Sequence, residues 1–235
     1  MKKIIASDYD RTFYINDEDI EKNKMAVDKF IKLGNKFIIA TGRSYYDLMK
    51  KVNQYNLIYD YSIINHGATI LNKKNDIIFN VSINNNIINE LKNELELEKS
   101  TEWFCCSKLE SRVDFEHTNL TKINVKYPTK KKSLEMNEKI NSKFSQYIIS
   151  YNITSSSIEI VSNKVNKSKS IKMLAEKLGV EKNNIYTIGD GYSDIQMIKD
   201  FNGYCMEESV EELKEIALEE LPSVSKLVEK VLNKN

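Results

Sequence analysis

Short apolar runs alternate with amphipathic helical stretches at both ends of this chain, and this alternation predicts a parallel β-sheet. Near the start, strands are expected at residues 2–7, 36–40 and 61–64, with helices expected between them at residues 20–33 and 44–56. Near the end, helices at residues 169–178 and 194–200 alternate with strands at 185–188 and 203–206, and two more helices follow. Crossover helices of this length join parallel strands, so we expect an α/β fold with a doubly wound, Rossmann-like core.

The middle of the chain has a different pattern. Helices expected at residues 84–97 and 134–144 stand among strands expected at 103–106, 112–115, 122–127, 146–150 and 158–160. Mainly consecutive strands with few helices indicate an α+β unit with an antiparallel sheet. We therefore expect a core domain formed by residues 1–80 and 160–235, with an inserted α+β cap domain at residues 81–159.

Composition limits the partners and the compartment. The chain has 35 Lys and Arg against 34 Asp and Glu, so no net field favours nucleic acid or an anionic membrane. Three cysteines without a Cys-x-x-Cys pair fit a reducing compartment, and Cys105 and Cys106 are expected to be small buried apolar residues. The first apolar run is too short for a signal peptide. We expect a soluble cytoplasmic protein with no nucleic-acid or membrane partner, and leave its oligomeric state open.

Two carboxylates, Asp8 and Asp10, directly follow the first expected strand. Side chains two residues apart in an extended chain point the same way, so these like charges repel unless a cation or a shared proton relieves them. A calcium-binding loop would need Gly at its sixth position and Glu at its twelfth. Those positions hold Phe13 and Asp19, which argues against that alternative. The pair therefore predicts a functional site.

Other polar residues occupy equivalent places in the expected core. Thr41 follows the second expected strand, Lys167 precedes a helix, and Asp190 follows the strand at 185–188, with Asp194 close behind. Ligands of parallel sheets bind outside the carboxyl ends of the strands. Carboxylates suit Mg²⁺, while a hydroxyl, a lysine and free backbone N–H groups suit a phosphate. The sequence thus predicts one site for a cation and a phosphate group.

Taken in order, these segments resemble the four motifs of the haloacid dehalogenase-like (HAD) superfamily. The matching stretches are Asp-Tyr-Asp-Arg-Thr at residues 8–12, Ala-Thr-Gly-Arg at 40–43, Lys167, and Gly-Asp-Gly-Tyr-Ser-Asp at 189–194. Residues 61–71 and the place of the insert are similar to the Cof-type branch, which carries a large α/β cap. The resemblance implies a Mg²⁺-dependent phosphatase that acts on a small phosphorylated metabolite, such as a sugar phosphate, through an aspartyl-phosphate.

The resemblance also implies roles for individual residues. Asp8 would be the nucleophile and Asp10 the acid and base for the leaving group and the attacking water. Thr41 and Lys167 would hold the phosphoryl oxygens. Mg²⁺ would be bound by Asp8, the backbone carbonyl of Asp10, and Asp190. Asp194 would support that metal shell or Lys167.

Further residues near these motifs are candidates for contact with the substrate: Gly42, Arg43 and His66. Departures from the family pattern include three single positions, and residues 205–209 replace a segment that often ends in Asn-Ala. Arg11 stands where a glycine is usual, Ser193 replaces an asparagine, and His66 replaces the asparagine of an Asn-Gly-Ala segment. We expect Arg11 to narrow the site entrance or to reach towards the substrate.

Two alternative functions stay open at this point. A phosphomutase of the phosphomannomutase-like type would share the motifs and the cap but return the phosphoryl group to another hydroxyl. A non-catalytic sensor of phosphorylated metabolites would keep the fold without turnover.

Overall fold

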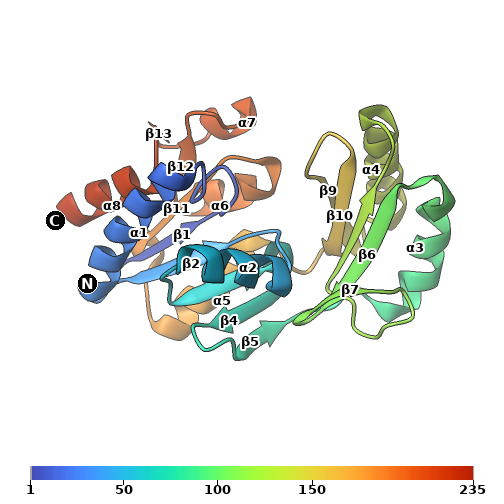
Figure 1. Cartoon of the computed structure of the whole chain (residues 1–235), viewed down its shortest axis with the longest axis horizontal. Helices are drawn as coiled ribbons and strands as arrows, with labels where there is room; N and C mark the ends of the chain where they lie inside the picture. Colours follow the sequence, from blue (N-terminus) through green and yellow to red (C-terminus); the bar gives the residue numbers. More distant parts are fainter. Residues whose placement is uncertain (1, 235) are drawn as a thin grey trace.

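Two separate β-sheets organise the chain, whose computed structural model describes residues 2–234 (Figure 1). The strands of the larger sheet are β1 (Ile4–Ser7), β2 (Lys36–Ala40), β3 (Tyr61–Ile64), β4 (Thr69–Asn72), β5 (Ile77–Asn80), β11 (Ile185–Gly189), β12 (Asn202–Met206) and β13 (Glu220–Leu221). Those of the smaller sheet are β6 (Glu102–Ser107), β7 (Glu110–Val113), β8 (Lys122–Lys126), β9 (Ile148–Asn152) and β10 (Ser157–Ser162).

The larger sheet has eight strands in the order β13-β12-β11-β1-β2-β3-β4-β5. Neighbours from β13 to β3 are parallel, whereas β4 pairs with β3 and β5 pairs with β4 in antiparallel fashion. The parallel part agrees with the alternation in the sequence. The β4–β5 hairpin and the two-residue strand β13 were not predicted, because the edge strands β5 and β13 are short and do not alternate apolar with polar residues.

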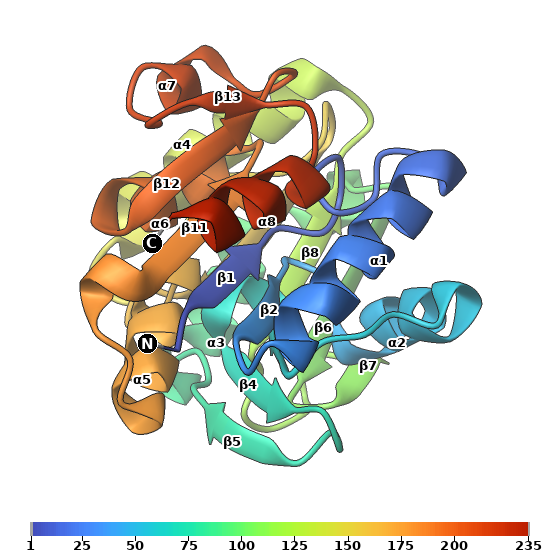
Figure 2. The same cartoon turned by 90° about the vertical axis from the view of Figure 1, so that its left-hand side faces the viewer.

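Helices cover both faces of the larger sheet (Figure 2). They are α1 (Asp17–Lys32), α2 (Tyr45–Tyr55), α5 (Lys167–Leu178), α6 (Ile195–Asp200), α7 (Glu211–Lys214) and α8 (Val224–Asn233). One apolar cluster joins Ile5 of β1 to α1, α2 and α8, and a second joins the neighbouring Ile4 and Ala6 to α5, α6 and α7. Successive β1 residues thus face opposite cores, as a strand requires. The doubly wound α/β core expected from the sequence is confirmed.

Several helices begin earlier than the apolar pattern indicated. Helices α1 and α5, together with α4 (Lys130–Phe144) of the smaller sheet, each follow a capping residue: Asn16, Asn166 and Thr129 respectively. The side chain of each cap accepts a hydrogen bond from a backbone N–H in the first helical turn. The capping residues, and not the first apolar residues, set these starts. Lys167 is therefore the first residue of α5.

The smaller sheet is antiparallel, with the order β7-β6-β8-β10-β9. Helices α3 (Ile88–Glu94) and α4 pack on the side turned away from the larger sheet, over one apolar cluster (Figure 1). The helix expected at 84–97 is shorter, because a 3-10 turn at Asn85–Ile87 precedes it and the left-handed backbone of Glu96, with φ of 49°, follows its end. This α+β unit confirms the fold class expected for the insert. Within residues 2–234, no helix is both long and apolar enough to cross a membrane.

Candidate active site

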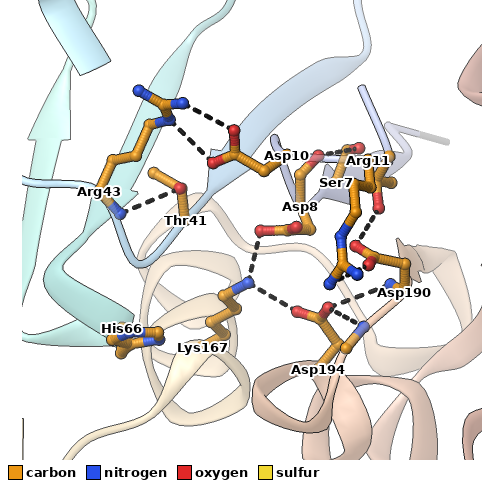
Figure 3. Close-up of polar contacts among 12 residues, drawn as sticks. Ser7, Asp8, Asp10, Arg11, Thr41, Arg43, His66, Lys167, Asp190 and Asp194 are labelled. Atoms are coloured by element: carbon orange, nitrogen blue, oxygen red, sulfur yellow. Dashed lines mark hydrogen bonds and ion pairs between the residues drawn. The ribbon is translucent and has the colours of Figure 1, made fainter. Parts of the chain in front are cut away.

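The carboxyl ends of three neighbouring parallel strands bring the polar residues together. Strand β1 lies between β11 and β2, so Asp8, Asp190 and Thr41 follow adjacent strands and emerge at the same edge (Figure 3). Asp8, Asp190 and Thr41 are all buried, with at most 8% of their surface exposed. The first turn of α5 presents Lys167 to the same point.

Lys167 joins two of the carboxylates. Its Nζ donates to Asp8 Oδ1 and to Asp194 Oδ1, each at 2.6 Å, and the side chain is 2% exposed. Although burial lowers it, the negative charges of Asp194 and Asp8 raise the pKa of Lys167, so the ammonium is held in its charged form. The second oxygen of Asp194 accepts from the backbone N–H groups of Asp190 and Gly191. Asp194 is therefore fixed on both oxygens and in turn fixes Lys167.

One lysine does not balance the negative charge at this edge. Burial raises the pKa of Asp8 well above its ordinary value against the opposing effect of Lys167, and the neighbouring Asp194 and Asp190 raise it further. Burial followed by Asp194 likewise raises the pKa of Asp190. Both directions mean that these carboxyl groups favour the neutral form unless further positive charge offsets their repulsion.

The carboxylates fit a divalent metal ion. Asp8, Asp190 and Asp194 each offer a ligand oxygen, and these atoms lie within 4.8 Å of one another. Thr12 Oγ1 donates to Asp190 Oδ1 at 2.9 Å, but Asp190 Oδ2 accepts no directed hydrogen bond from any residue within 2–234. Buried oxygens of this kind are ligands that Mg²⁺ prefers. Because Asp194 already serves Lys167 and two N–H groups, Asp8 and Asp190 are the better-placed metal ligands.

Asp10 lies apart from this carboxylate group and is paired with Arg43. Arg43 donates from Nε to Asp10 Oδ2 at 2.8 Å and from Nη2 to Asp10 Oδ1 at 2.7 Å. The guanidinium also lies over the Tyr9 ring, with its carbon 5.3 Å from the ring centre. A two-pronged pair of this kind fixes the plane of the carboxylate. Sequence reasoning assigned Arg43 to the substrate, whereas its contacts here hold Asp10, whose side chain is 47% exposed.

The turn after β2 is built around Gly42. The Thr41 hydroxyl accepts from the backbone N–H of Arg43 at 3.1 Å, which orients it. The His66 ring packs directly on Gly42, because a Cβ there would lie only 2.4 Å from His66 Cε1. His66 is buried, and in Figure 3 it lies below the turn, away from Asp8. Gly42 and His66 thus shape the loop that carries Thr41.

Sequence reasoning missed a buried polar network that the smaller sheet contributes next to this loop. Lys122 Nζ of β8 donates to the Gly42 carbonyl and to Glu159 Oε1 of β10, both at 2.6 Å. Glu159 also contacts His66 Nε2 at 2.5 Å and accepts from Asn124 Nδ2 at 3.2 Å. A signal was available, because Lys122 and Asn124 alternate with apolar residues in β8.

Charges within this network are strongly coupled. Although burial raises it, the positive charge of Lys122 and the His66 hydrogen bond lower the pKa of Glu159 to about 2. Burial lowers the pKa of His66 despite Glu159, and the nearby positive charges of Lys122 and Lys167 lower it further. The network therefore joins an ionised glutamate to Lys122 and to a neutral histidine that donates from Nε2.

Comparison with known proteins identifies the class that this fold and site define. A family model described as haloacid dehalogenase-like hydrolase matches residues 5–113 and 106–227. The chain belongs to the haloacid dehalogenase-like hydrolases. The resemblance noted from the sequence is thereby confirmed.

Individual relatives are similar over nearly the whole chain. An uncharacterized protein of Mycoplasma capricolum is 32% identical over 237 residues, which cover 86% of this chain and 88% of the relative. A Buchnera aphidicola (subsp. Baizongia pistaciae) protein named "Putative phosphatase" is 24% identical and covers 98% of both chains.

Solved structures match the fold closely at low sequence identity. A "putative HAD/COF-like hydrolase" from Plasmodium vivax has a TM-score of 0.86 at 16% identity, covering 100% of this chain and 96% of the other. A haloacid dehalogenase-like hydrolase from B. subtilis has a TM-score of 0.84 at 16% identity, covering 99% and 100%. At this level of sequence identity, the structural similarity establishes the fold of both sheets and nothing further.

Proposed function

We propose that this protein is a Mg²⁺-dependent phosphatase that hydrolyses a small phosphate monoester, such as a sugar phosphate, through an aspartyl-phosphate. The observation that carries this proposal is the position of Asp8, held at 2.6 Å by Lys167 and within 4.8 Å of the buried carboxylate oxygens of Asp190 and Asp194. The family membership and the name of the Buchnera relative support it. We further propose that residues 1–80 and 160–235 form the core and that residues 81–159 form the cap.

Positive charge makes the attack of one anion on another feasible. Asp8 and Asp190, with the backbone carbonyl of Asp10, would hold Mg²⁺, which supplies charge to neutralise the phosphate oxygens. Lys167 contributes a fixed ammonium to the same oxygens, and the Thr41 hydroxyl contributes a hydrogen bond. These groups offset the repulsion that otherwise keeps a carboxylate from a phosphate dianion.

Hydrolysis then takes two displacements at phosphorus. In the first, a carboxylate oxygen of Asp8 forms a bond to phosphorus while the bond from phosphorus to the leaving oxygen breaks, and Asp10 protonates that oxygen. In the second, Asp10 takes a proton from a water molecule, the water oxygen bonds to phosphorus, and the bond to Asp8 breaks. Inorganic phosphate and free Asp8 result. Arg43 keeps the Asp10 carboxylate oriented for both proton transfers.

The smaller sheet would cover the substrate. Lys122 of its polar network donates to the Gly42 carbonyl. This hydrogen bond joins the proposed cap to the turn that carries Thr41. Closure would exclude water and read the part of the substrate beyond the phosphate. A cytoplasmic location belongs to the proposal as well, and it is supported by three buried free cysteines.

Replacement of the nucleophile tests the proposal. Asp8→Asn should lower Mg²⁺-dependent hydrolysis of p-nitrophenyl phosphate by at least about 10³-fold, because an amide cannot form the acyl-phosphate. Asp28→Asn, which alters a partly exposed carboxylate on α1, is the matched control and should keep wild-type activity. Wild-type turnover by Asp8→Asn would show that Asp8 is not the nucleophile. A panel of phosphorylated sugars and nucleotides would then define the substrate class.

A further inference from the structure

Arg11 occupies a backbone position that ordinarily favours glycine. It follows Asp10 in the turn after β1, and its φ of 59° lies in the left-handed region. A side chain with a Cβ is strained in that region, whereas glycine is not. The chain nevertheless places a long cationic side chain at this strained position. The contacts of that side chain are what a glycine here could not make.

The Arg11 side chain turns back towards the carboxylates. Its Nη2 lies 2.7 Å from Asp190 Oδ2, the oxygen that accepts no directed hydrogen bond within residues 2–234 (Figure 3). The Arg11 side chain is 72% exposed, whereas Asp190 is 2% exposed. One end of the contact is thus buried, and the other faces solvent.

A count of charge shows what this contact replaces. Asp8, Asp190 and Asp194 carry three negative charges when ionised, and Lys167 balances one of them. A divalent cation balances the remaining two, whereas one guanidinium balances half of that charge. Arg11 and a metal ion at Asp190 Oδ2 would compete for the same oxygen, and their positive charges would repel each other.

We propose that Arg11 is a built-in counter-ion of the metal site, bound to Asp190 Oδ2 in the metal-free protein and displaced into solvent when Mg²⁺ binds. This inference rests on the metal-binding part of the proposed function. It follows that Arg11 stabilises the metal-free protein and weakens its affinity for Mg²⁺. The residue would set the Mg²⁺ concentration at which the site becomes loaded.

Substitution at residue 11 separates charge from backbone strain. Arg11→Gln removes the charge and keeps a Cβ, Arg11→Gly removes both, and Arg11→Lys keeps the charge. Each protein is stripped with EDTA and titrated with Mg²⁺ in a calorimeter, and its melting temperature is measured with EDTA and with saturating Mg²⁺. Lys22→Gln on α1 removes one exposed charge elsewhere and serves as the control for net charge.

Arg11→Gln and Arg11→Gly should both bind Mg²⁺ about three- to tenfold more tightly, the scale expected for a partly exposed ion pair combined with loss of repulsion. Arg11→Gln should also melt lower than wild type in EDTA and gain more from Mg²⁺. Arg11→Lys and Lys22→Gln should stay near wild type.

Each other outcome points to a specific failure. Equal Mg²⁺ affinity in wild type and Arg11→Gln would overturn the counter-ion role and leave the metal site standing. Tighter binding by Arg11→Gly alone would assign the effect to backbone strain and equally overturn it. Absence of Mg²⁺ binding in every variant would overturn both this inference and the metal-binding part of the proposed function.

Discussion

Loss of the Lys122 ammonium should weaken the contact between the smaller sheet and the Gly42 turn, and so lower the stability of the protein. In Lys122→Met, a side chain of similar length loses the ammonium that bonds Glu159 and the Gly42 carbonyl, both at 2.6 Å. Lys122 is 2% exposed and Glu159 6%, so the remaining carboxylate charge has little access to water. Removing one partner of a buried pair costs about 3–5 kcal/mol, which lowers the melting temperature of a protein of this size by roughly 6–20 °C.

The pH dependence of this loss follows from His66. In wild type the folded-state pKa of His66 lies below its ordinary value of 6.5, so the folded protein resists protonation and loses stability as pH falls below 6.5. In Lys122→Met the opposing charge is gone and Glu159 lacks its cation, so the folded-state pKa of His66 rises. Where it exceeds the unfolded value, protonated His66 pairs with Glu159 and the variant gains stability as pH falls. The destabilisation should therefore be smaller at pH 5.5 than at pH 8.

Urea denaturation at both pH values measures these effects, with the fluorescence of Trp103, the single tryptophan, as the signal. Lys126→Met, an exposed lysine on the same strand, is the matched control and should change the free energy of unfolding by no more than about 0.5 kcal/mol. A loss below about 1 kcal/mol for Lys122→Met would refute the buried-pair reasoning. An equal loss at pH 5.5 and pH 8 would refute the role given to His66.

Two further substitutions test the loop and the packing beneath the site. Gly42→Ala places a Cβ 2.4 Å from His66 Cε1, so the loop or the ring must shift; we expect a cost of about 1–3 kcal/mol in urea and a lower kcat/KM for p-nitrophenyl phosphate. Asn23→Ala removes the side chain that bonds the Phe13 carbonyl at 2.9 Å and the Ser225 N–H at 2.8 Å. We expect the free energy of unfolding in urea to fall by about 1–3 kcal/mol, while the Mg²⁺ affinity measured by calorimetry stays at the wild-type value.

The parallel core is predictable because its signal is local. Apolar runs followed by helices identify crossover units, and such units bring the carboxyl ends of their strands to one edge. That rule is enough to group Asp8, Thr41 and Asp190 from the order of the elements along the chain. The β4–β5 hairpin escaped prediction because β5 is half exposed and has no clear alternation.

The remaining features depend on which strands become neighbours. Lys122 and Glu159 meet because β8 pairs with β10, a register that neither segment specifies alone. The family pattern singled out Arg11 as unusual, but the direction of its side chain depends on the left-handed backbone of the turn. Likewise, the pairing of Arg43 with Asp10 depends on how two separate loops approach each other.

The central place of β1 has a consequence for how the protein is made. Residues 4–7 leave the ribosome early, yet one edge of β1 stays open until residues 185–188 arrive to pair with it. The smaller sheet spans 102–162 without interruption, so its contacts can form while the core still waits for its partner strands. A nascent chain thus carries an unpaired strand edge for most of its synthesis, and unpaired edges can pair with strands of other chains. Because Lys167, Asp190 and Asp194 all lie in the last third of the chain, the site is complete only after Asp194 has emerged.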